Sequence, residues 1–424
     1  MDNREILNWG PFSTPDMERI KLLRSEGINV WDVEENKYID AYSGLWNMNF
    51  GYGNSTIEKN IIEQMRNLPF YNPIVFSSKL NEQVAHKLIN ILNLGQGKVV
   101  YGCSGSEGVE IAIKIARKYS NIIEGETSIR NKIAVIDGAY HGTTYGALSA
   151  TRYSVTDDGY GPMLDGFITL PNPAGDFEDN NAYYIKKLDK LFSVNKDKIC
   201  AILIEPVLAS AGVFILPDEY VEYIKKECEE NNILLISDEV SAGFYRSRDS
   251  FGFHRYNMSP DIVVMSKGIN NGYLPLSATY INSKIVSKFL EFGVSLEHMS
   301  TQGGNPICLS SANATLDYYE RPLILDEIKA LKTEFRTKIY DYFNDLEKVK
   351  QIRVEGLMAG IELYVNDYNE LFENIKKILT KRVIVGFSYY KNKGTILIFP
   401  SYVTKKDELE IILRTIREVI KNND

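Results

Sequence analysis

The stretch ILLISDEVSAGFYRSRDSFGFHRYNMSPDIVVMSKG, residues 233–268, decides the fold. It begins and ends with short apolar runs, at 233–238 and 262–265, that lack polar alternation. Such runs are typical of strands covered on both faces, as in a parallel sheet flanked by helices. Asp238 closes the first run and Lys267 follows the second. Because ligands bind beyond the carboxyl ends of strands in open α/β sheets, these endings indicate a ligand site.

The same pattern continues upstream of this stretch. We expect strands at 98–101, 133–137 and 200–205, and helices at 107–119 and 219–230. Alternating strands and helices predict an α/β fold with a mostly parallel sheet.

The two ends of the chain differ from this pattern. Residues 28–41 suggest a β-hairpin that turns at Glu35-Asn36, and Thr56 is expected to cap a helix ending near residue 67. After residue 307 the helices lengthen, and strands are expected only at 358–363 and 395–399. We therefore divide the chain into three parts, namely an N-terminal segment that packs with the small domain (1–55), a large domain (56–306) and a small α+β domain (307–424).

Bulk composition narrows the function class. The chain has 424 residues and a formal net charge of -8, which argues against nucleic acid or anionic lipid as a main partner. No apolar run approaches the ~20 residues of a membrane helix. The four cysteines form no CxxC pair, which predicts free thiols in a reducing cytoplasm. The four histidines lack metal-ligand spacing, so no metal is expected.

Two further strand ends could bind parts of a ligand. Residues Ser104-Gly105-Ser106 follow the strand at 98–101 and precede a helix, where they can hold a phosphate or simply cap the helix. Tyr140 and His141 follow the strand at 133–137 and can stack on a flat ring or merely pack.

Charged residues end the other strands. Glu205 and Asp238 can cap helices, but acids after apolar strands favour a cationic partner. Lys267 alone would be interpreted as a solvated loop lysine. A phosphate cup, an aromatic plate, a buried acid and a strand-end lysine together are the parts of a pyridoxal 5'-phosphate (PLP) site. Asp238 would keep the ring nitrogen protonated, and Lys267 would form the Schiff base and move the proton.

Ordered motifs cover nearly the whole chain. They are DAYSGLWNMNFGYG (40–53), LPFYN (68–72), SGSEGVEIAIKIAR (104–117), YHG (140–142), EPV (205–207), DEVSAGFYR (238–246), SKGINNGYLP (266–275) and HMSTQGGNP (298–306). In this order they resemble the class III aminotransferases of PLP fold type I, the ω-transaminase group in particular. The resemblance implies a large domain with a mostly parallel seven-stranded sheet flanked by helices, plus a smaller α+β domain.

The resemblance also implies a role for each matching residue. Ser104, Gly105 and Ser106 would bind the phosphate, Tyr140 and His141 would lie at the ring, Val240 would pack on its opposite face, and Glu205 would position Asp238. Thr301 would reach the phosphate of the partner subunit's cofactor, which implies an obligate homodimer. Phe12, Leu45 and Trp46 would line the substrate pocket.

One family feature is missing. The ω-transaminase pattern has an arginine after an apolar strand, where it binds a substrate carboxylate, but Gly386 stands there in this chain. The stretch 395–401, which carries an arginine in other class III enzymes, has none either. Lys391, Lys393 or Arg382 is a candidate replacement; alternatively, the substrate has no carboxylate at this place.

The resemblance implies an aminotransferase that moves an amino group from an amine or amino-acid donor to a ketone or aldehyde through a Lys267 Schiff base and pyridoxamine phosphate. Two other functions remain open at this point. One is a PLP-dependent racemase, aminomutase or decarboxylase on the same fold. The other is a PLP- or nucleotide-binding protein, or an assembly scaffold, without catalysis.

Overall fold

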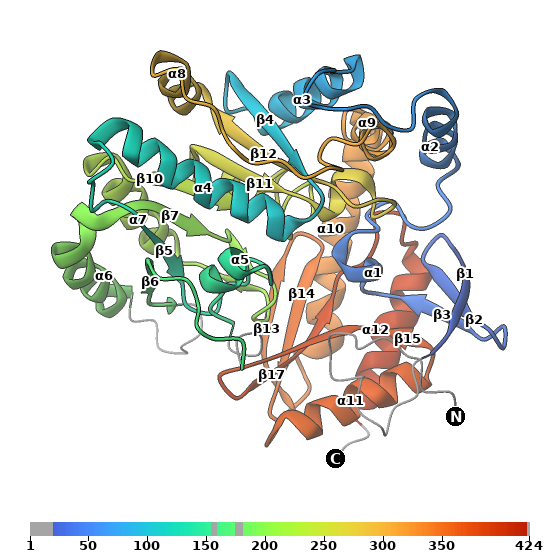
Figure 1. Ribbon diagram of the computed structural model, residues 1–424. Coiled ribbons are helices and arrows are strands. Elements are labelled where there is room, and N and C mark those ends of the chain that lie inside the picture. The colour runs from blue at the N-terminus through green and yellow to red at the C-terminus, as the bar shows by residue number, and fades with distance from the viewer. Residues whose placement is uncertain (1–19, 154–158, 174–180, 422–424) are drawn as a thin grey trace.

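The computed structural model describes residues 20–153, 159–173 and 181–421 (Figure 1). Phe12, expected in the substrate pocket, lies outside the described residues. The largest sheet has seven strands. In spatial order they are β4 (Gly97–Gly102), β12 (Ser277–Asn282), β11 (Ile262–Met265), β10 (Leu234–Asp238), β7 (Ile199–Ile204), β5 (Lys132–Ile136) and β6 (Phe167–Leu170).

The seven-stranded sheet is mostly parallel, as expected. Only β12 runs against its neighbours β11 and β4, so these two strands share one direction. The β11–β10, β10–β7, β7–β5 and β5–β6 pairs are parallel. The carboxyl ends of β4, β5, β7, β10 and β11 therefore meet at one edge, where the sequence placed the ligand site.

Helices cover both faces of this sheet, which explains the unbroken apolar runs. Alternate strand residues point to opposite faces, so Ile236 packs in the cluster of one face and Leu235 in that of the other. The first face carries α4 (Gly105–Glu124), α5 (Tyr145–Ala150) and α8 (Ser283–Glu291). The second carries α6 (Asn181–Asn195) and α7 (Asp218–Glu230), and Figure 1 shows α4 crossing in front of the strands.

Two strands and one cap differ from expectation. β6 and β12 were not expected; β12 reads SATYIN, yet its Thr279 is fully buried and donates its hydroxyl to Gly108 O at 3.2 Å. A satisfied hydroxyl is tolerated inside a sheet, so hydropathy misses such a strand. Helix α2 (Ser55–Asn67) is capped by Asn54, whose Oδ1 accepts from Ile57 N, and the expected cap Thr56 is wrong.

The C-terminal part is an antiparallel sheet with three helices. Its strand order is β13 (Val349–Glu355), β14 (Met358–Leu363), β17 (Lys393–Ile398) and β16 (Gly386–Tyr390). The helices are α10 (Pro322–Phe343), α11 (Tyr368–Thr380) and α12 (Lys406–Lys421). The expected strands at 358–363 and 395–399 are confirmed, whereas β13 and β16 were missed.

The N-terminal hairpin joins the C-terminal part. β2 (Asn29–Asp32) and β3 (Lys37–Asp40) are antiparallel, and Glu35 in the turn between them has a φ of 62°. β1 (Leu22–Glu26) extends the hairpin, and β15 (Val383–Ile384) pairs with β3 in parallel. Figure 1 shows these blue strands beside red C-terminal elements. The three-part division at residues 55 and 306 stays a prediction.

Short elements and two helices complete the fold. They are α1 (Ser43–Trp46), α3 (Lys79–Leu92), α9 (Pro306–Tyr319), β8 (Val207–Leu208), β9 (Phe214–Ile215), and the 3-10 turns η3 (Lys196–Lys198), η4 (Gly252–Tyr256) and η5 (Lys267–Asn270). α9 packs against α2, α3 and η5. Within the described ranges, no helix combines the length and apolarity needed to cross a bilayer.

Glu239 links the carboxyl end of β10 to η4. It is fully buried directly after β10, and its carboxylate accepts from the backbone N–H groups of Gly252 and Phe253, both at 2.8 Å. Ser237 Oγ donates to the same carboxylate at 3.1 Å. Burial raises the pKa of Glu239 to about 7.

We predict that Glu239→Ala destabilises the fold by about 2–4 kcal/mol, because it leaves two buried N–H donors unpaired. Glu239→Gln keeps one acceptor oxygen and should cost less. Glu229→Ala, at an exposed position on α7, is the matched control and should change stability by less than about 0.5 kcal/mol. Urea unfolding at one protein concentration measures all three, and equal midpoints for Glu239→Ala and the control would contradict the prediction.

Candidate active site

Lys267 lies at the edge of the sheet where the carboxyl ends of the parallel strands meet. It starts η5, which follows β11. Its φ of 42° is in the left-handed region, which a non-glycine residue adopts only when its surroundings hold it there. Nζ donates to Ser241 Oγ at 2.8 Å and lies 4.2 Å from the centre of the Trp46 ring. The amine is therefore held by a hydroxyl and by an aromatic face.

The surroundings of Lys267 lower the pKa of its amine and so favour the uncharged form. Burial lowers its pKa to about 8, although the negative charges of Asp238 and Glu205 oppose this shift. An ammonium loses hydration when buried, so the neutral form gains relative to the charged form. A larger fraction of this amine than of a solvated lysine is therefore unprotonated near neutral pH.

Asp238 is a buried acid held by two neighbours. Its Oδ1 accepts from Val240 N at 3.1 Å, and its Oδ2 lies 2.8 Å from Nδ1 of His141. His141 is 2% exposed, and among the described residues its Nε2 has no hydrogen-bond partner. The sequence motifs predicted that His141 lies at the ligand. They did not indicate its contact with Asp238, which orients this carboxylate.

Glu205 links the ends of β7 and β5. Its Oε1 accepts from the backbone N–H of Tyr140 at 2.7 Å. Burial, and then the negative charge of Asp238, raise the pKa of Glu205 well above its ordinary value. Tyr140 itself is half-buried, and burial raises the pKa of its phenol. Glu205 thus fixes the backbone from which the Tyr140 ring projects. The negative charge of Asp238 disfavours a second negative charge on Glu205.

The predicted phosphate cup is the N-terminus of α4. Ser104 is its N-cap, with Oγ accepting from Glu107 N at 3.2 Å. A Cβ on Gly105 would lie 2.9 Å from Cγ1 of Val240, and Ser106 Oγ accepts from Thr143 N at 3.2 Å. Glycine is therefore required at 105 by close packing. The first-turn N–H groups of a helix lack intrahelical acceptors and attract anions, so this end can hold a phosphate.

Thr301 lies in a turn fixed to the same helix start. Glu107 accepts from Cys103 N at 2.6 Å through Oε2, and its Oε1 lies 3.1 Å from Nε2 of His298. Thr301 is exposed to solvent. The sequence identified Thr301 and Ser104, but it did not reveal that Glu107 joins the two segments.

The expected substrate pocket is brought together only in part. Trp46 is 7% exposed and faces Lys267, whereas the side chain of Leu45 is 55% exposed. Trp46 also stacks on Phe399, with ring centres 4.8 Å apart and an interplanar angle of 11°. Tyr42 meets both rings edge-on at 5.7 Å. Sequence reasoning missed Tyr42 and Phe399, although Tyr42 stands inside the quoted motif at 40–53.

The three candidate replacements for the missing arginine all have other partners. Lys391 pairs with Asp137 at 2.6 Å. Arg382 bonds to the hydroxyl of Tyr38 in the N-terminal sheet. Lys393 lies over the ring of Phe214, 5.7 Å from its centre.

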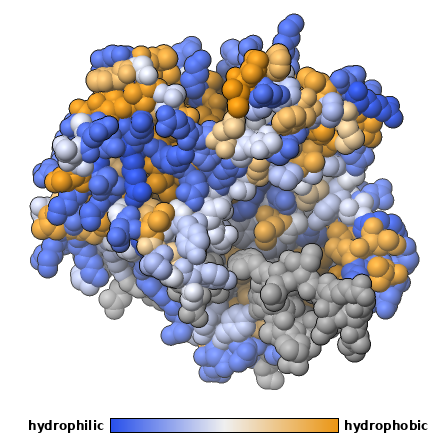
Figure 2. Space-filling view, in the orientation of Figure 1, coloured by the Kyte–Doolittle hydropathy of each residue, from blue (hydrophilic) through white to orange (hydrophobic). Residues whose placement is uncertain are grey.

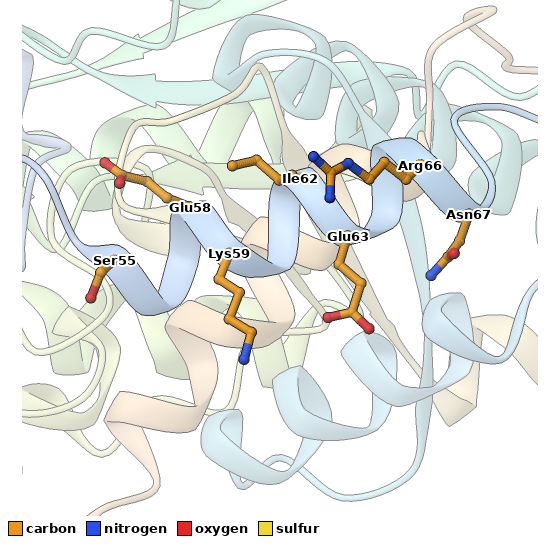
Figure 3. A pocket seen from close by; sticks show the side chains of 7 residues that line it. All are labelled: Ser55, Glu58, Lys59, Ile62, Glu63, Arg66 and Asn67. Carbon is orange, nitrogen blue, oxygen red and sulfur yellow. The ribbon is translucent and has the colours of Figure 1, made fainter.

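A groove of about 660 Å³ lies elsewhere, along α2. Figure 3 shows its lining, which comes from one helix: Ser55, Glu58, Lys59, Ile62, Glu63, Arg66 and Asn67. All seven residues are exposed, and none belongs to the predicted site, so this groove is an open surface.

In the described part of the chain, no group of three His, Cys, Asp or Glu side chains is placed to hold a metal ion.

Comparisons with known proteins agree over nearly the whole chain. The sequence profile of the family described as aminotransferase class-III matches residues 13–420. The uncharacterized aminotransferase YhxA of Bacillus subtilis is 31% identical over 420 residues, which cover 93% of this chain and 90% of the relative. The acetylornithine aminotransferase of Caldanaerobacter subterraneus is 29% identical, covering 95% and 94%.

A solved structure agrees as well. The crystal structure of a Bacillus anthracis aminotransferase superimposes with a TM-score of 0.89 at 28% identity, covering 98% of this chain and 95% of that one. Both the sequence and the fold therefore indicate an enzyme that transfers amino groups. The chain belongs to the class III aminotransferases.

Proposed function

We propose that this aminotransferase binds PLP covalently through Nζ of Lys267. The proposal rests on the half-buried Lys267, which is held at the carboxyl edge of the sheet by Ser241 and Trp46, and whose pKa is lowered to about 8. In the overall reaction, the donor amine becomes a carbonyl compound, and the acceptor aldehyde or ketone becomes an amine. The amino group and hydrogen move one way and the oxygen moves the other, so no external oxidant is needed.

The polar groups at the strand ends fit this cofactor. The N-terminus of α4, with Gly105 and Ser106, supplies N–H and hydroxyl donors for a phosphate. Asp238, oriented by His141, supplies a carboxylate for a protonated ring nitrogen, and Tyr140 offers an aromatic face. Bound PLP supplies an electron sink that stabilises negative charge on the substrate carbon next to nitrogen.

Lys267 would also move the proton. Its neutral Nζ can accept the proton from the carbon that bears the amino group and return it when the acceptor is aminated. Ser241 and the Trp46 ring restrict where Nζ can lie, which aims this transfer. Because its pKa is lowered to about 8, the amine releases its proton more easily than a solvated lysine does.

We further propose that the enzyme is a homodimer with Thr301 acting on the partner's cofactor. An apolar segment from α2 to α3 is exposed, with Ile62 at 49%, Ile74 at 73%, Val75 at 68% and Phe76 at 63%. Patches of this kind usually mark an interface. Figure 3 shows Ile62 on the same side of α2 as Glu58 and Arg66, and Figure 2 shows hydrophobic residues along the upper edge of the molecule, over α8, α3 and α2. A second copy of this chain is the occupant that also brings Thr301 to a site.

We place the enzyme in the cytoplasm. Its four cysteines, Cys103, Cys200, Cys228 and Cys308, are free thiols. A chain of this length with free thiols is typical of a reducing compartment.

We predict that Lys267→Ala abolishes covalent PLP binding and lowers amino transfer by at least about a thousandfold, because both attachment and proton transfer are lost. Borohydride reduction followed by mass spectrometry should find cofactor mass on the wild type and none on the variant. Lys284→Ala removes an exposed lysine from α8 and should behave like wild type. Cofactor mass retained on Lys267→Ala would disprove the assignment.

The lowered pKa of Lys267 predicts how cofactor capture depends on pH. Only the neutral amine attacks the aldehyde, so the rate at which apoprotein gains the absorbance of bound PLP should rise with pH, with a midpoint near 8. Asp238→Asn removes a negative charge that stabilises the ammonium, so the midpoint should move to lower pH. Stopped-flow absorbance over a pH series measures both, and a flat profile through pH 8 would refute the charge-state argument.

If the exposed apolar segment forms the dimer interface, placing charged residues in it should produce a monomer. Phe76→Asp combined with Ile74→Asp should shift the mass in light scattering from twice 48.2 kDa toward 48.2 kDa, because two carboxylates would be buried in the interface. Ile129→Asp, at a position 63% exposed in another loop, is the control and should remain dimeric. A dimer that survives the double substitution would place the interface elsewhere.

A further inference from the structure

The space that a side chain at position 386 would need is occupied by the ring of Tyr42. A Cβ built at 386 would lie 2.0 Å from Cε2 and 2.1 Å from Cζ of Tyr42, far inside contact distance. Gly386 is not among the glycines with positive φ, so its backbone would accept other residues. The Tyr42 ring, and not the backbone, therefore requires glycine at this position.

The two stretches where a carboxylate-binding arginine was expected lie side by side. Gly386 on β16 pairs directly with Leu397 on β17. Leu397 is fully buried and belongs to the cluster that contains Trp46 and Phe399, against which Tyr42 packs. Neither stretch thus presents a cation, and the space next to Gly386 holds a phenol ring.

Tyr42, Trp46 and Phe399 form an aromatic wall beside the reactive amine. Trp46 and Phe399 are stacked, and Tyr42 meets both of them edge-on. The Trp46 face lies 4.2 Å from Nζ of Lys267, so the wall adjoins the place where a substrate carbon would be attached. Burial raises the pKa of Tyr42 far above neutral pH, which keeps this wall uncharged.

The terminal nitrogens of the buried arginines near this region already donate to protein acceptors. Arg246 donates to Pro400 O and to Asn49 Oδ1. Arg353 donates to Glu362 at 2.6 Å. A substrate carboxylate would have to displace these acceptors to reach the terminal nitrogens of either guanidinium, and Nε of Arg246, the one nitrogen of the two groups without a partner among the described residues, is itself buried.

We infer, building on the proposed function, that Tyr42 replaces the carboxylate-binding arginine and restricts the enzyme to amines and carbonyl compounds without a carboxylate on the reacting carbon. A carboxylate against the aromatic wall loses its hydration without gaining a cation. Aryl and alkyl groups, in contrast, gain contact area there. Both half-reactions use the same site, so the restriction applies to donor and acceptor alike.

The test compares two donors that differ in one group. In 1-phenylethylamine the amino carbon carries a methyl group, and in phenylglycine it carries a carboxylate. Stopped-flow loss of the absorbance of bound PLP gives kcat/KM for each donor with wild-type holoenzyme. The amine should be preferred by at least about 100-fold, the equivalent of leaving one carboxylate desolvated. Equal rates would overturn the inference.

Variants at positions 42 and 386 separate the effect of the Tyr42 ring volume from the effect of a missing positive charge. Gly386→Arg alone should clash with Tyr42 and gain nothing with phenylglycine. Tyr42→Ala with Gly386→Arg provides both room and a cation and should raise kcat/KM for phenylglycine by at least about tenfold. Tyr42→Ala alone is the control for added room, and Tyr42→Phe keeps the ring without the hydroxyl. Both should keep the preference for the amine. Loss of the preference in Tyr42→Phe would mean that the hydroxyl, and not the aromatic ring, excludes the carboxylate, and would refute the inference.

A binding measurement gives a readout that does not depend on turnover. Calorimetric titration with benzoate should show binding to the double variant and none to wild type. A double variant that retains bound PLP yet gains neither benzoate binding nor phenylglycine turnover would refute the exchange of Tyr42 for arginine. Wild type that cannot bind PLP, or reacts with neither donor, would instead defeat the proposed function. Wild type that bleaches with both donors equally would leave that function standing and defeat only this inference.

Discussion

Burial of the Lys267 amine is the constraint on which the site depends. An ammonium in a dry environment is costly, and the protein compensates only in part. Ser241 accepts one hydrogen bond, the Trp46 face offers an attractive quadrupole, and two acids lie close by. The result is a pKa of about 8, which neither locks the amine in its charged form nor removes the charge altogether. The nucleophile and proton carrier that we propose at Lys267 would need this intermediate state.

The seven-stranded sheet makes this burial possible. Lys267 follows a strand with helices on both faces, which leaves it only partly exposed, and its positive φ turns the chain into η5 at once. The same edge gathers Asp238 and Glu205, whose mutual repulsion is balanced by donors from Val240, His141 and the Tyr140 backbone. Parallel strands thus bring together groups that would be solvated anywhere else in the chain.

Sequence alone could find the parts of the site that follow strand ends. Lys267, Asp238, Glu205 and the start of α4 each come directly after an apolar run, so topology predicts their convergence. Contacts between distant segments were not predictable in this way. The pairing of His141 with Asp238 and the packing of Tyr42 on Gly386 depend on how side chains fill space, which no periodicity encodes. For the same reason β12 was missed, since its buried Thr279 hydroxyl looks polar in sequence and finds its acceptor only in the fold.

Trp46 would connect the proposed catalysis at Lys267 to the proposed choice of substrate. One face of its indole lies against the Lys267 amine, and the ring is held in place by stacking on Phe399 and by the edge of Tyr42. An arginine at 386 would displace Tyr42, remove one of the supports of Trp46 and add a positive charge near Nζ. Both changes would alter the environment that sets the charge state of Lys267. An arginine therefore could not be placed at 386 by a single substitution without disturbing the surroundings of the Lys267 amine, because Tyr42 supports the Trp46 ring that faces this amine.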